Sequence, residues 1–281
     1  MELNKLLLKK LNNLFSLPIH PFNLQNQGKI SYAQWQFERG FETIKYYSAY
    51  VAFDEMFVKK KVLDVGCGAA GKSIYFAKQG AKIVYGIDPI ATYKKQAELL
   101  TKKMNLQDNF RFVIGSATSM PFDNSYFDTI ILNDSMEHVD KPEKVLYECY
   151  RVLKKNGMIY INFPPYKHPF GAHLSDAIGI PWVHLFFSEK VLIETYKDLI
   201  KSLPDAKERA KLRIGIDKDG NEYLSYINKM TIKKFEKIIT NSKFNRVYYE
   251  IIPLRKVIAP ILKIPILKEY LTKMVVFIGK K

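Results

Sequence analysis

The chain has 281 residues, a hydrophobic fraction of 47% and a formal charge of +16 at pH 7, which suits one large globular domain or one domain with an inserted lobe. Its two cysteines form no CxxC pair, so the composition argues against a zinc site or a disulfide framework and favours a reducing, cytoplasmic setting. No apolar run approaches membrane-spanning length. The lysines are spread along the chain without a dense basic block, and composition explains the charge better than nucleic-acid binding does.

Residues 1–57 are predicted to form a helical extension before the first strand. A helical projection of residues 1–17 places an apolar face opposite a face of lysine and asparagine. The apolar face consists of Leu3, Leu7, Leu11, Leu14 and Phe15. We expect this helix to pack on its own domain; a surface anchor or a lid over a ligand is the alternative. Residues 31–57 are rich in aromatic side chains and are expected to pack beside the loop that follows the first strand.

Residues 61–71 have the sequence Lys-Val-Leu-Asp-Val-Gly-Cys-Gly-Ala-Ala-Gly. The apolar run predicts a buried strand, and three glycines separate it from a helix predicted over residues 72–79. Gly66 suits the positive φ of a tight turn, and Gly68 suits close approach of a ligand to the backbone. Gly71 is expected to let the new helix pack against the strand. This order of strand, glycine turn and helix is typical of a nucleotide-binding loop.

The chain then alternates short apolar runs with amphipathic segments. Strands are predicted over residues 83–87, 110–114, 127–132 and 158–163. Between the last two of these strands, a helix is predicted to begin at Pro142, with Asp140 as its N-cap, Cys149 on its buried face and Gly157 as its stop. Such alternation predicts a doubly wound, parallel sheet.

The regular pattern pauses after residue 163. Residues 164–229 are predicted to form an inserted cap. Residues 231–240 resume as a helix, and residues 246–252 and 274–278 are predicted to be two closing strands. The prediction is thus a single domain, with a core formed by residues 61–163 and 231–281.

A ligand of an open parallel sheet binds outside the carboxyl ends of the strands. Asp64 and the glycines follow the first strand. Asp88 ends the second strand, about 20 residues after Gly68, at the spacing of an acid that accepts both ribose hydroxyls. Enzymes that bind a dinucleotide also have these features, so the features do not by themselves identify the nucleotide-like ligand.

Four motifs occur in order and at regular spacing: Asp-Val-Gly-Cys-Gly-Ala-Ala-Gly at residues 64–71, Gly-Ile-Asp at 86–88, Phe-Asp-Thr-Ile followed by Glu-His-Val within 127–139, and Arg-Val-Leu-Lys-Lys-Asn-Gly at 151–157. This set resembles the class I S-adenosylmethionine-dependent methyltransferases, especially the group that acts on small molecules and lipid-like substrates. The resemblance covers residues 61–163. It implies a Rossmann-like, mostly parallel, seven-stranded sheet with an antiparallel last strand.

The resemblance implies S-adenosylmethionine as the cofactor, S-adenosylhomocysteine as its product and no metal. An acid beside the glycine loop suits a positive sulfonium and ammonium group, whereas it would repel a pyrophosphate. Many members of the family have Asp where this chain has Ser116, which would contact the adenine amine more weakly. The implied cofactor-binding residues are Asp64, Gly66, Cys67, Gly68, Asp88, Pro89, Ile90, Ser116, Ala117, Asn133 and Asp134.

Histidine is the residue best suited to deprotonate a hydroxyl acceptor near neutral pH. His138 follows the fourth strand and is a candidate base; the alternative is a supporting residue that bonds to the backbone. His173 and His184 of the cap are further candidates.

We therefore expect an enzyme that methylates a small-molecule, lipid or glycan-precursor acceptor by in-line displacement. A cap with several aromatic residues suits an enclosed pocket; they are Trp182, Phe186, Phe187 and Tyr196. The alternatives are an RNA or DNA methyltransferase, which only the charge supports, and a non-catalytic S-adenosylmethionine-binding module. The apolar N-terminal helix and the basic, apolar residues 255–273 also predict peripheral contact with a membrane.

Two further motifs are interpreted as turns. Residues 162–166, Asn-Phe-Pro-Pro-Tyr, resemble the Asn/Asp-Pro-Pro-Tyr motif of enzymes that methylate amino groups of nucleic acids. That motif belongs after the fourth strand, and here the residues follow the fifth. Residues 217–220 resemble the start of an EF-hand, but no bidentate glutamate closes the loop.

Overall fold

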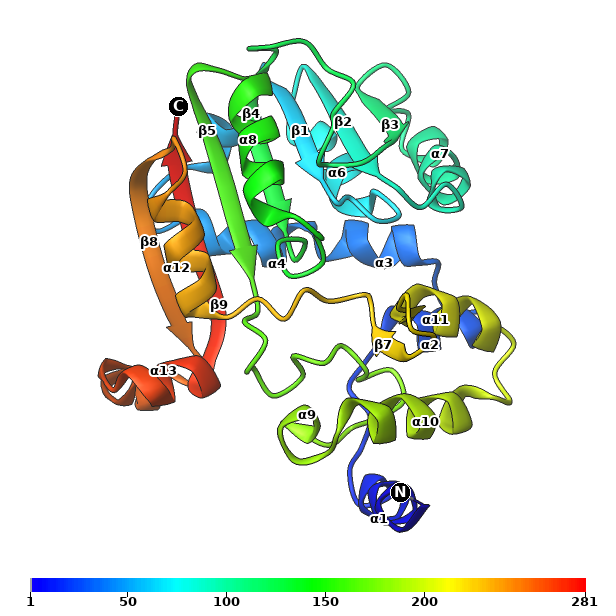
Figure 1. Cartoon of the computed structure of the whole chain (residues 1–281). Helices are drawn as coiled ribbons and strands as arrows, with labels where there is room; N and C mark the ends of the chain where they lie inside the picture. The colour runs from blue at the N-terminus through cyan, green and yellow to red at the C-terminus, as the bar shows by residue number, and fades with distance from the viewer. Residues whose placement is uncertain (1) are drawn as a thin grey trace.

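A computed structural model describes residues 2–281 and contains one seven-stranded sheet (Figure 1). The strands lie in the order β3-β2-β1-β4-β5-β9-β8. Strands β1 to β5 are parallel, and β9 is antiparallel to both β5 and β8. The predicted Rossmann-like sheet with an antiparallel last strand is therefore confirmed. The strands are β1 Lys61–Val65, β2 Ile83–Asp88, β3 Phe110–Ile114, β4 Phe127–Asn133, β5 Leu153–Phe163, β8 Asn245–Pro253 and β9 Thr272–Lys280.

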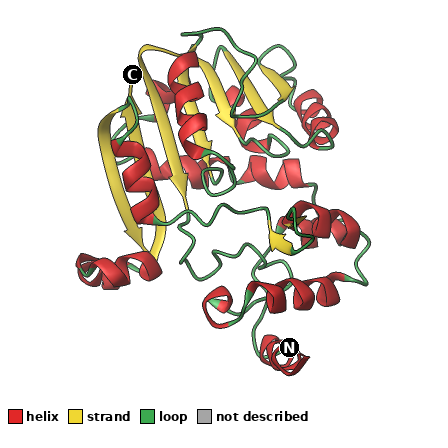
Figure 2. Ribbon diagram, viewed as in Figure 1, coloured by secondary structure: helices red, strands yellow, loops and turns green. Residues whose placement is uncertain are grey.

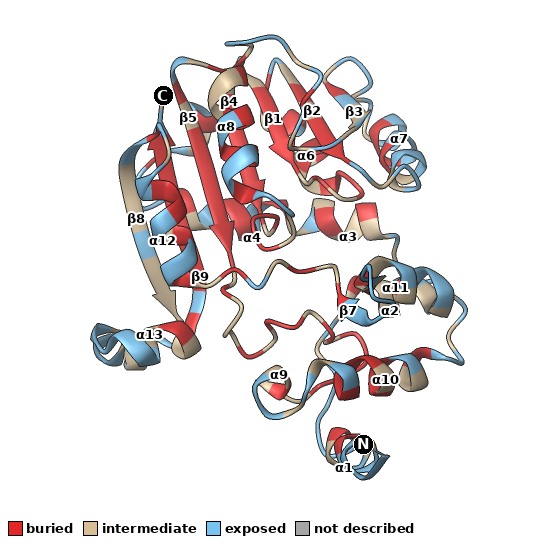
Figure 3. Ribbon diagram, in the orientation of Figure 1, coloured by how far each residue is buried: buried red, intermediate tan, exposed pale blue. Residues whose placement is uncertain are grey.

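Helices cover both faces of the sheet, and the central strands are therefore buried on both sides (Figure 3). Successive residues of a strand point to opposite faces. Leu63 and Val65 of β1 lie in the hydrophobic core beneath α8 and α12, whereas Val62 lies in the core beneath α6 and α7. The helices around the sheet are α3 Tyr32–Glu38, α4 Gly40–Ile44, η1 Lys45–Tyr47, α5 Phe53–Phe57, α6 Gly71–Lys78, α7 Tyr93–Lys103, α8 Pro142–Val152, α12 Ile232–Thr240, η2 Lys256–Lys263 and α13 Pro265–Leu271.

Two details of α8 differ from the prediction. Its N-cap is Lys141, and no side chain caps the helix, so the capping role expected for Asp140 is wrong. Gly157 does not stop the helix, because α8 ends at Val152 and Gly157 lies within β5. A Cβ atom there would come within 2.8 Å of the Leu153 side chain, so the glycine relieves crowding inside the strand.

The cap is made mostly of helices and loops, with one short hairpin (Figure 2). It has its own hydrophobic core, which includes residues between 172 and 227 and also Leu8 from the N-terminal helix. The N-terminal extension is therefore divided: α1 packs with the cap, whereas α3 to α5 pack on the sheet. The elements on the cap side are α1 Glu2–Asn12, α2 Pro21–Asn26, α9 Val183–Phe186, α10 Glu189–Ile200, α11 Ala206–Arg213, β6 Ile214–Ile216 and β7 Glu222–Leu224.

Helix α1 packs through a different face from the one expected. Leu8 and Asn12 are buried, while Leu3 is 77% exposed. Asn12 explains the orientation, because its side chain donates to the Ala177 carbonyl at 3.0 Å and accepts from the Gly179 amide at 2.8 Å. These contacts turn most of the leucines outward. Among the described residues, no helix is long and apolar enough to cross a bilayer.

Candidate cofactor and acceptor site

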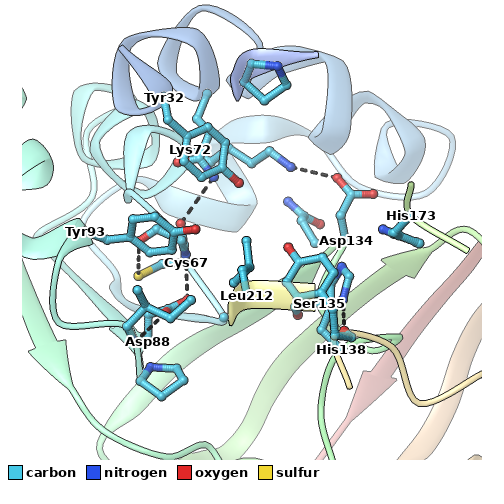
Figure 4. A pocket seen from close by; sticks show the side chains of 18 of the residues that line it. Tyr32, Cys67, Lys72, Asp88, Tyr93, Asp134, Ser135, His138, His173 and Leu212 are labelled. Carbon is cyan, nitrogen blue, oxygen red and sulfur yellow. Dashed lines mark hydrogen bonds and ion pairs between the residues drawn. The ribbon is translucent and has the colours of Figure 1, made fainter. Parts of the chain in front are cut away.

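A cleft of about 1450 Å³ lies at the carboxyl ends of β1, β2 and β4, between the sheet and the cap. All the residues predicted to bind the cofactor line it, and so do His138 and His173. Figure 4 shows Asp88 and Tyr93 on one side of the cleft and His138 and His173 on the opposite side. The cleft therefore has an end at β2 with an acidic and an aromatic side chain, and a histidine-lined end near the cap.

The glycine loop after β1 forms one wall of this cleft. Gly66 and Gly68 have φ angles of 73° and 56°, which favour glycine. A Cβ atom at Gly66 would come within 2.7 Å of the Ser135 Cβ atom. The loop can therefore lie close to the end of β4 only because Gly66 has no side chain.

Asp88 holds this loop in place. Its Oδ2 atom accepts a hydrogen bond from the Gly68 amide, and its Oδ1 atom accepts one from the Ile90 amide, each at 2.9 Å. Burial raises the pKa of Asp88, and the two amide bonds oppose that shift. Each carboxylate oxygen keeps a second lone pair. Asp88 can therefore hold the loop and also accept hydrogen bonds from two ligand hydroxyls.

Asp64 connects β1 to the helix that follows. Its Oδ2 atom accepts a hydrogen bond from the Ser73 hydroxyl of α6 at 2.6 Å. The side chain is buried, and burial raises its pKa to about 6, opposed by the Ser73 bond and by the charge of Lys72. Asp64 also lines the cleft, so a role in holding the loop and a role toward a bound cation are both compatible with its position.

Helix α3 covers the glycine loop, as expected for part of residues 31–57. The Gln36 side chain accepts a hydrogen bond from the Gly71 amide at 3.2 Å and donates one to the Cys67 carbonyl at 3.4 Å. A Cβ atom at Gly71 would lie 2.0 Å from the Ala33 carbonyl oxygen. Gly71 therefore permits close packing of α6 on α3. Helix α6 also packs on the sheet, as predicted, but the atoms nearest to a Cβ atom at Gly71 belong to α3.

Several residues that line the cleft were not predicted from the sequence. Tyr32 of α3 and Tyr93 of α7 pack edge to face with ring centroids 5.6 Å apart. Lys72 forms an ion pair of 2.7 Å with Asp134, and Figure 4 shows this pair between the two ends of the cleft. The aromatic content of residues 31–57 was the available signal for Tyr32, but nothing in the sequence indicated which aromatic residues face the cleft.

The end of β4 is fixed by buried amides. The Asn133 Oδ1 atom accepts hydrogen bonds from the Tyr47 hydroxyl at 2.7 Å and from the Asn162 side chain at 2.8 Å. The Asn133 side-chain nitrogen is buried and has no hydrogen-bond partner among the described residues. Asn133 therefore offers a donor to a ligand, because its oxygen is already occupied.

His138 lies at the opposite end of the cleft from Asp88. Its Nδ1 atom donates to the Tyr226 backbone carbonyl at 2.6 Å, which leaves Nε2 with a free lone pair. Burial lowers the pKa of His138 to about 4, and the ring is neutral at pH 7. The His173 ring packs edge to face on it at 4.7 Å. Both roles predicted for His138, a base and a residue bonded to the backbone, are compatible with this geometry.

Glu137 is buried directly behind His138. Neither of its carboxylate oxygens has a hydrogen-bond partner among the described residues, and burial raises its pKa. Possible ligand atoms of Glu137, His138 and His173 lie within 4.8 Å of one another. The Glu137 Oε1 and His138 Nε2 atoms are 3.7 Å apart, a separation that two ligands of one metal ion can have. The absence of a metal stays a prediction.

Other predicted residues lie away from the cleft. His184 bonds through Nε2 to the Tyr166 carbonyl at 2.8 Å and does not line the cleft. Tyr196 is fully buried in the cap core, and Phe186 is 77% exposed. The cap aromatics named in the sequence analysis are therefore not walls of this cleft. Tyr226, which follows β7, lines the cleft in their place.

The two rejected motifs have structural roles. Asn162 lies at the end of β5 rather than in a turn, and its side chain donates to Asn133, Tyr47 and the Thr43 carbonyl. Asp217 accepts hydrogen bonds from two backbone amides in the turn between β6 and β7. Neither motif is part of the cleft.

Part of the chain is similar in sequence to known methyltransferases. A family model described as a methyltransferase domain matches residues 63–161. Botryococcene C-methyltransferase of Botryococcus braunii is 40% identical over 94 residues, which are 34% of this chain and 25% of that protein. Sterol 24-C-methyltransferase of Saccharomyces cerevisiae is 35% identical over 96 residues, again 34% of this chain and 25% of that protein. The matches thus span a quarter of the length of these relatives.

The fold has a match over most of the chain. An S-adenosylmethionine dependent methyltransferase from Mesorhizobium loti superposes with a TM-score of 0.52 over 84% of this chain and 96% of that chain, at 12% identity. Fold and sequence matches together define a methyltransferase domain. The predicted resemblance to the class I S-adenosylmethionine-dependent methyltransferases is therefore confirmed for residues 63–161, the part of the chain that the family model matches.

Proposed function

We propose that this protein binds S-adenosylmethionine in the cleft and transfers its methyl group to a small, lipid-like acceptor. The observation that carries the proposal is that all the cofactor-binding residues implied by the family resemblance line one cleft, opposite a neutral histidine. Asp88 would hold the ribose. Pro89, Ile90, Ser116 and Ala117 would surround the adenine, and Gly66, Asn133 and Asp134 would border the methionine part.

The cofactor would supply an activated methyl group, so the protein mainly has to orient the acceptor and exclude water. His138 would take the proton of an acceptor hydroxyl at Nε2. Its Nδ1–H bond to the Tyr226 carbonyl would hold the ring in the required tautomer. Tyr226 and the cap would close this end of the cleft against solvent.

A lipid-like acceptor is favoured by the apolar part of the lining. The cap side of the lining contains Ile19, Phe22, Leu212 and Tyr226, and α3 adds Trp35 from the other side. By their names, the two relatives act on botryococcene and on a sterol. Such acceptors would be met at a bilayer surface. The lining also has charged residues of both signs on the cap side, so it lacks the uniformly basic stretch that would favour RNA or DNA; they are Asp205, Lys207, Glu208, Arg209 and Lys211.

The test combines binding and transfer with the full chain. Calorimetry should detect binding of S-adenosylmethionine and S-adenosylhomocysteine. Incubation with methyl-labelled S-adenosylmethionine should label a component of an organic extract rather than RNA or DNA. Absence of cofactor binding would favour a non-catalytic module, and labelling of nucleic acid alone would overturn the acceptor class.

A further inference from the structure

One outer edge of the molecule carries a set of exposed apolar residues. They belong to three segments, α1 with the turn after it, α9, and η2 with α13. In Figure 1 these segments lie along one lower edge of the molecule, and no other described element lies beyond them on that side. We call the set the apolar rim; its members are Leu3, Leu6, Leu7, Leu14, Phe15, Leu185, Phe186, Val257, Ile261, Ile264, Ile266 and Leu267.

Helix α1 contributes its leucines because its inward face is largely polar. Lys5 forms an ion pair of 2.8 Å with Asp198 of α10, and Lys9 contacts the same carboxylate. A helix that served only its own core would bury its leucines and expose its lysines. Here Leu8 is buried, but Lys5 and Lys9 also lie against α10, while Leu3 and Leu14 are 77% and 78% exposed. Single exposed apolar residues are ordinary, whereas several of them on one outer edge of a molecule are typical of an interaction surface.

The segment of η2 and α13 adds positive charge to the rim. Val257 is 80% exposed, Ile266 is 72% exposed, and η2 has no buried residue. Arg255, Lys256 and Lys263 are exposed beside them. No acidic residue occurs between residues 251 and 268, so this part of the rim is uniformly basic. In Figure 3 most of η2 and the first residues of α13 have the colour of exposed residues.

We propose that the apolar rim docks this protein on the surface of an anionic lipid bilayer. Apolar side chains would enter the boundary between headgroups and acyl chains, and the basic residues would contact lipid phosphates, as in interfacial helices. The rim consists of separate elements along an outer edge, which suits an extended surface better than a peptide. The charge pattern selects anionic rather than neutral lipid.

The rim also connects to the cleft. Residues 13–20 lead from α1 toward α2, and Leu17 and Ile19 in this segment are 45% and 74% exposed. Ile19 also lines the cleft. An apolar acceptor would therefore have an apolar path from the bilayer to the cap side of the cleft. This path, unlike the docking itself, rests on the proposed function.

Vesicle flotation of the full chain tests the docking. The protein should float with vesicles of phosphatidylcholine and phosphatidylglycerol, much less with phosphatidylcholine alone, and less as salt rises. The triple substitution Leu7→Asp, Val257→Asp and Ile266→Asp should weaken binding at least about tenfold. Leu99→Asp is the matched control, because Leu99 is 62% exposed but lies on α7, outside the rim.

Three results would overturn the docking. They are failure of the wild type to float, equal flotation of the triple variant, and a rim-dependent dimer in solution that replaces lipid binding. Cofactor affinity measured on the same variants separates this test from that of the proposed function. An unchanged affinity shows that the rim variants are folded, and flotation does not require methyl transfer.

Discussion

Two buried aspartates are held in opposite ways. Asp64 lies on the wall of the cleft that the ends of β1, β2 and β4 form, and Asp176 lies in the cap. Asp64 accepts a side-chain hydrogen bond from Ser73, and burial raises its pKa to about 6. Asp176 is also buried, but Arg213 and Arg209 lie 3.0 Å and 2.9 Å from its oxygens and hold its pKa below the ordinary value despite burial. The cap uses its carboxylate for its own packing, whereas the carboxylate of the wall suits a cationic ligand.

The same difference extends to how the two regions are built. The wall consists of short motifs, each of which lies at the end of one strand. The cap depends on residues far apart in the chain: Arg209 of α11 donates to Asn23 of α2 at 2.8 Å as well as to Asp176. We therefore expect substitutions in the cap to act on stability and substitutions on the wall to act on ligands.

The largest effect is expected from Asp176→Ala. Removing one member of a buried ion cluster leaves two buried guanidinium groups without their partner, which costs about 3–5 kcal/mol. The free energy of unfolding, measured by urea denaturation, should fall by that amount. Glu222→Ala is the control in the same cap, because it breaks the solvent-exposed pair with Lys197 and should cost less than about 1 kcal/mol. Equal effects of the two substitutions would contradict the assigned role of the buried cluster.

His138→Gln changes a residue at the end of the cleft next to the cap, where the two regions meet. Loss of a general base lowers turnover by about a hundredfold, while the dissociation constant for S-adenosylmethionine should change little. His184→Gln is the matched control, because His184 also bonds to a backbone carbonyl but lies outside the cleft. Turnover is measured with the acceptor identified by methyl labelling. If His184→Gln reduced turnover as much as His138→Gln, the role of His138 as the base would be wrong.

Asp88→Ala should act on the cofactor and not on the cap. The change removes the acceptor for the Gly68 and Ile90 amides and the proposed ribose contact. We expect S-adenosylmethionine to bind about 30-fold more weakly, which corresponds to about 2 kcal/mol. Asp108→Ala is an exposed control before β3. Calorimetric titration of both variants decides; an unchanged affinity in Asp88→Ala would remove the ribose assignment.

The wall could be predicted from the sequence far better than the cap, because its motifs are local whereas the contacts of the cap join distant residues. A strand, a glycine turn and a terminal acid are encoded within a few consecutive residues, so Asp64, Gly66 and Asp88 could be placed without knowledge of the rest. Helix α1 was oriented wrongly because its inward face is selected by Asn12 and by Asp198, which is 189 residues from Lys9 in sequence. Gln36 and Tyr226 were missed because only the packing of distant segments brings them to the cleft.

The smallest effect is the pH dependence of the cofactor-free protein. Because the folded pKa of Asp64 is about 6 and the unfolded value is about 3.9, the folded state binds this proton more tightly. Lowering the pH from 7 to 5 should therefore increase the free energy of unfolding by about 1 kcal/mol from this group. Asp176, with its lowered pKa, acts in the opposite direction and only at lower pH.

Comparison of the wild type with Asp64→Asn isolates the contribution of Asp64, because asparagine keeps the shape of the side chain and does not titrate. Urea denaturation at pH 7 and pH 5 should give the wild type an increase in stability that Asp64→Asn lacks. Identical changes in the two proteins would mean that Asp64 is not destabilised by burial. The contrast between an uncompensated carboxylate on the wall and a paired one in the cap would then be lost, and with it the reason to expect that a cationic ligand is favoured beside the glycine loop.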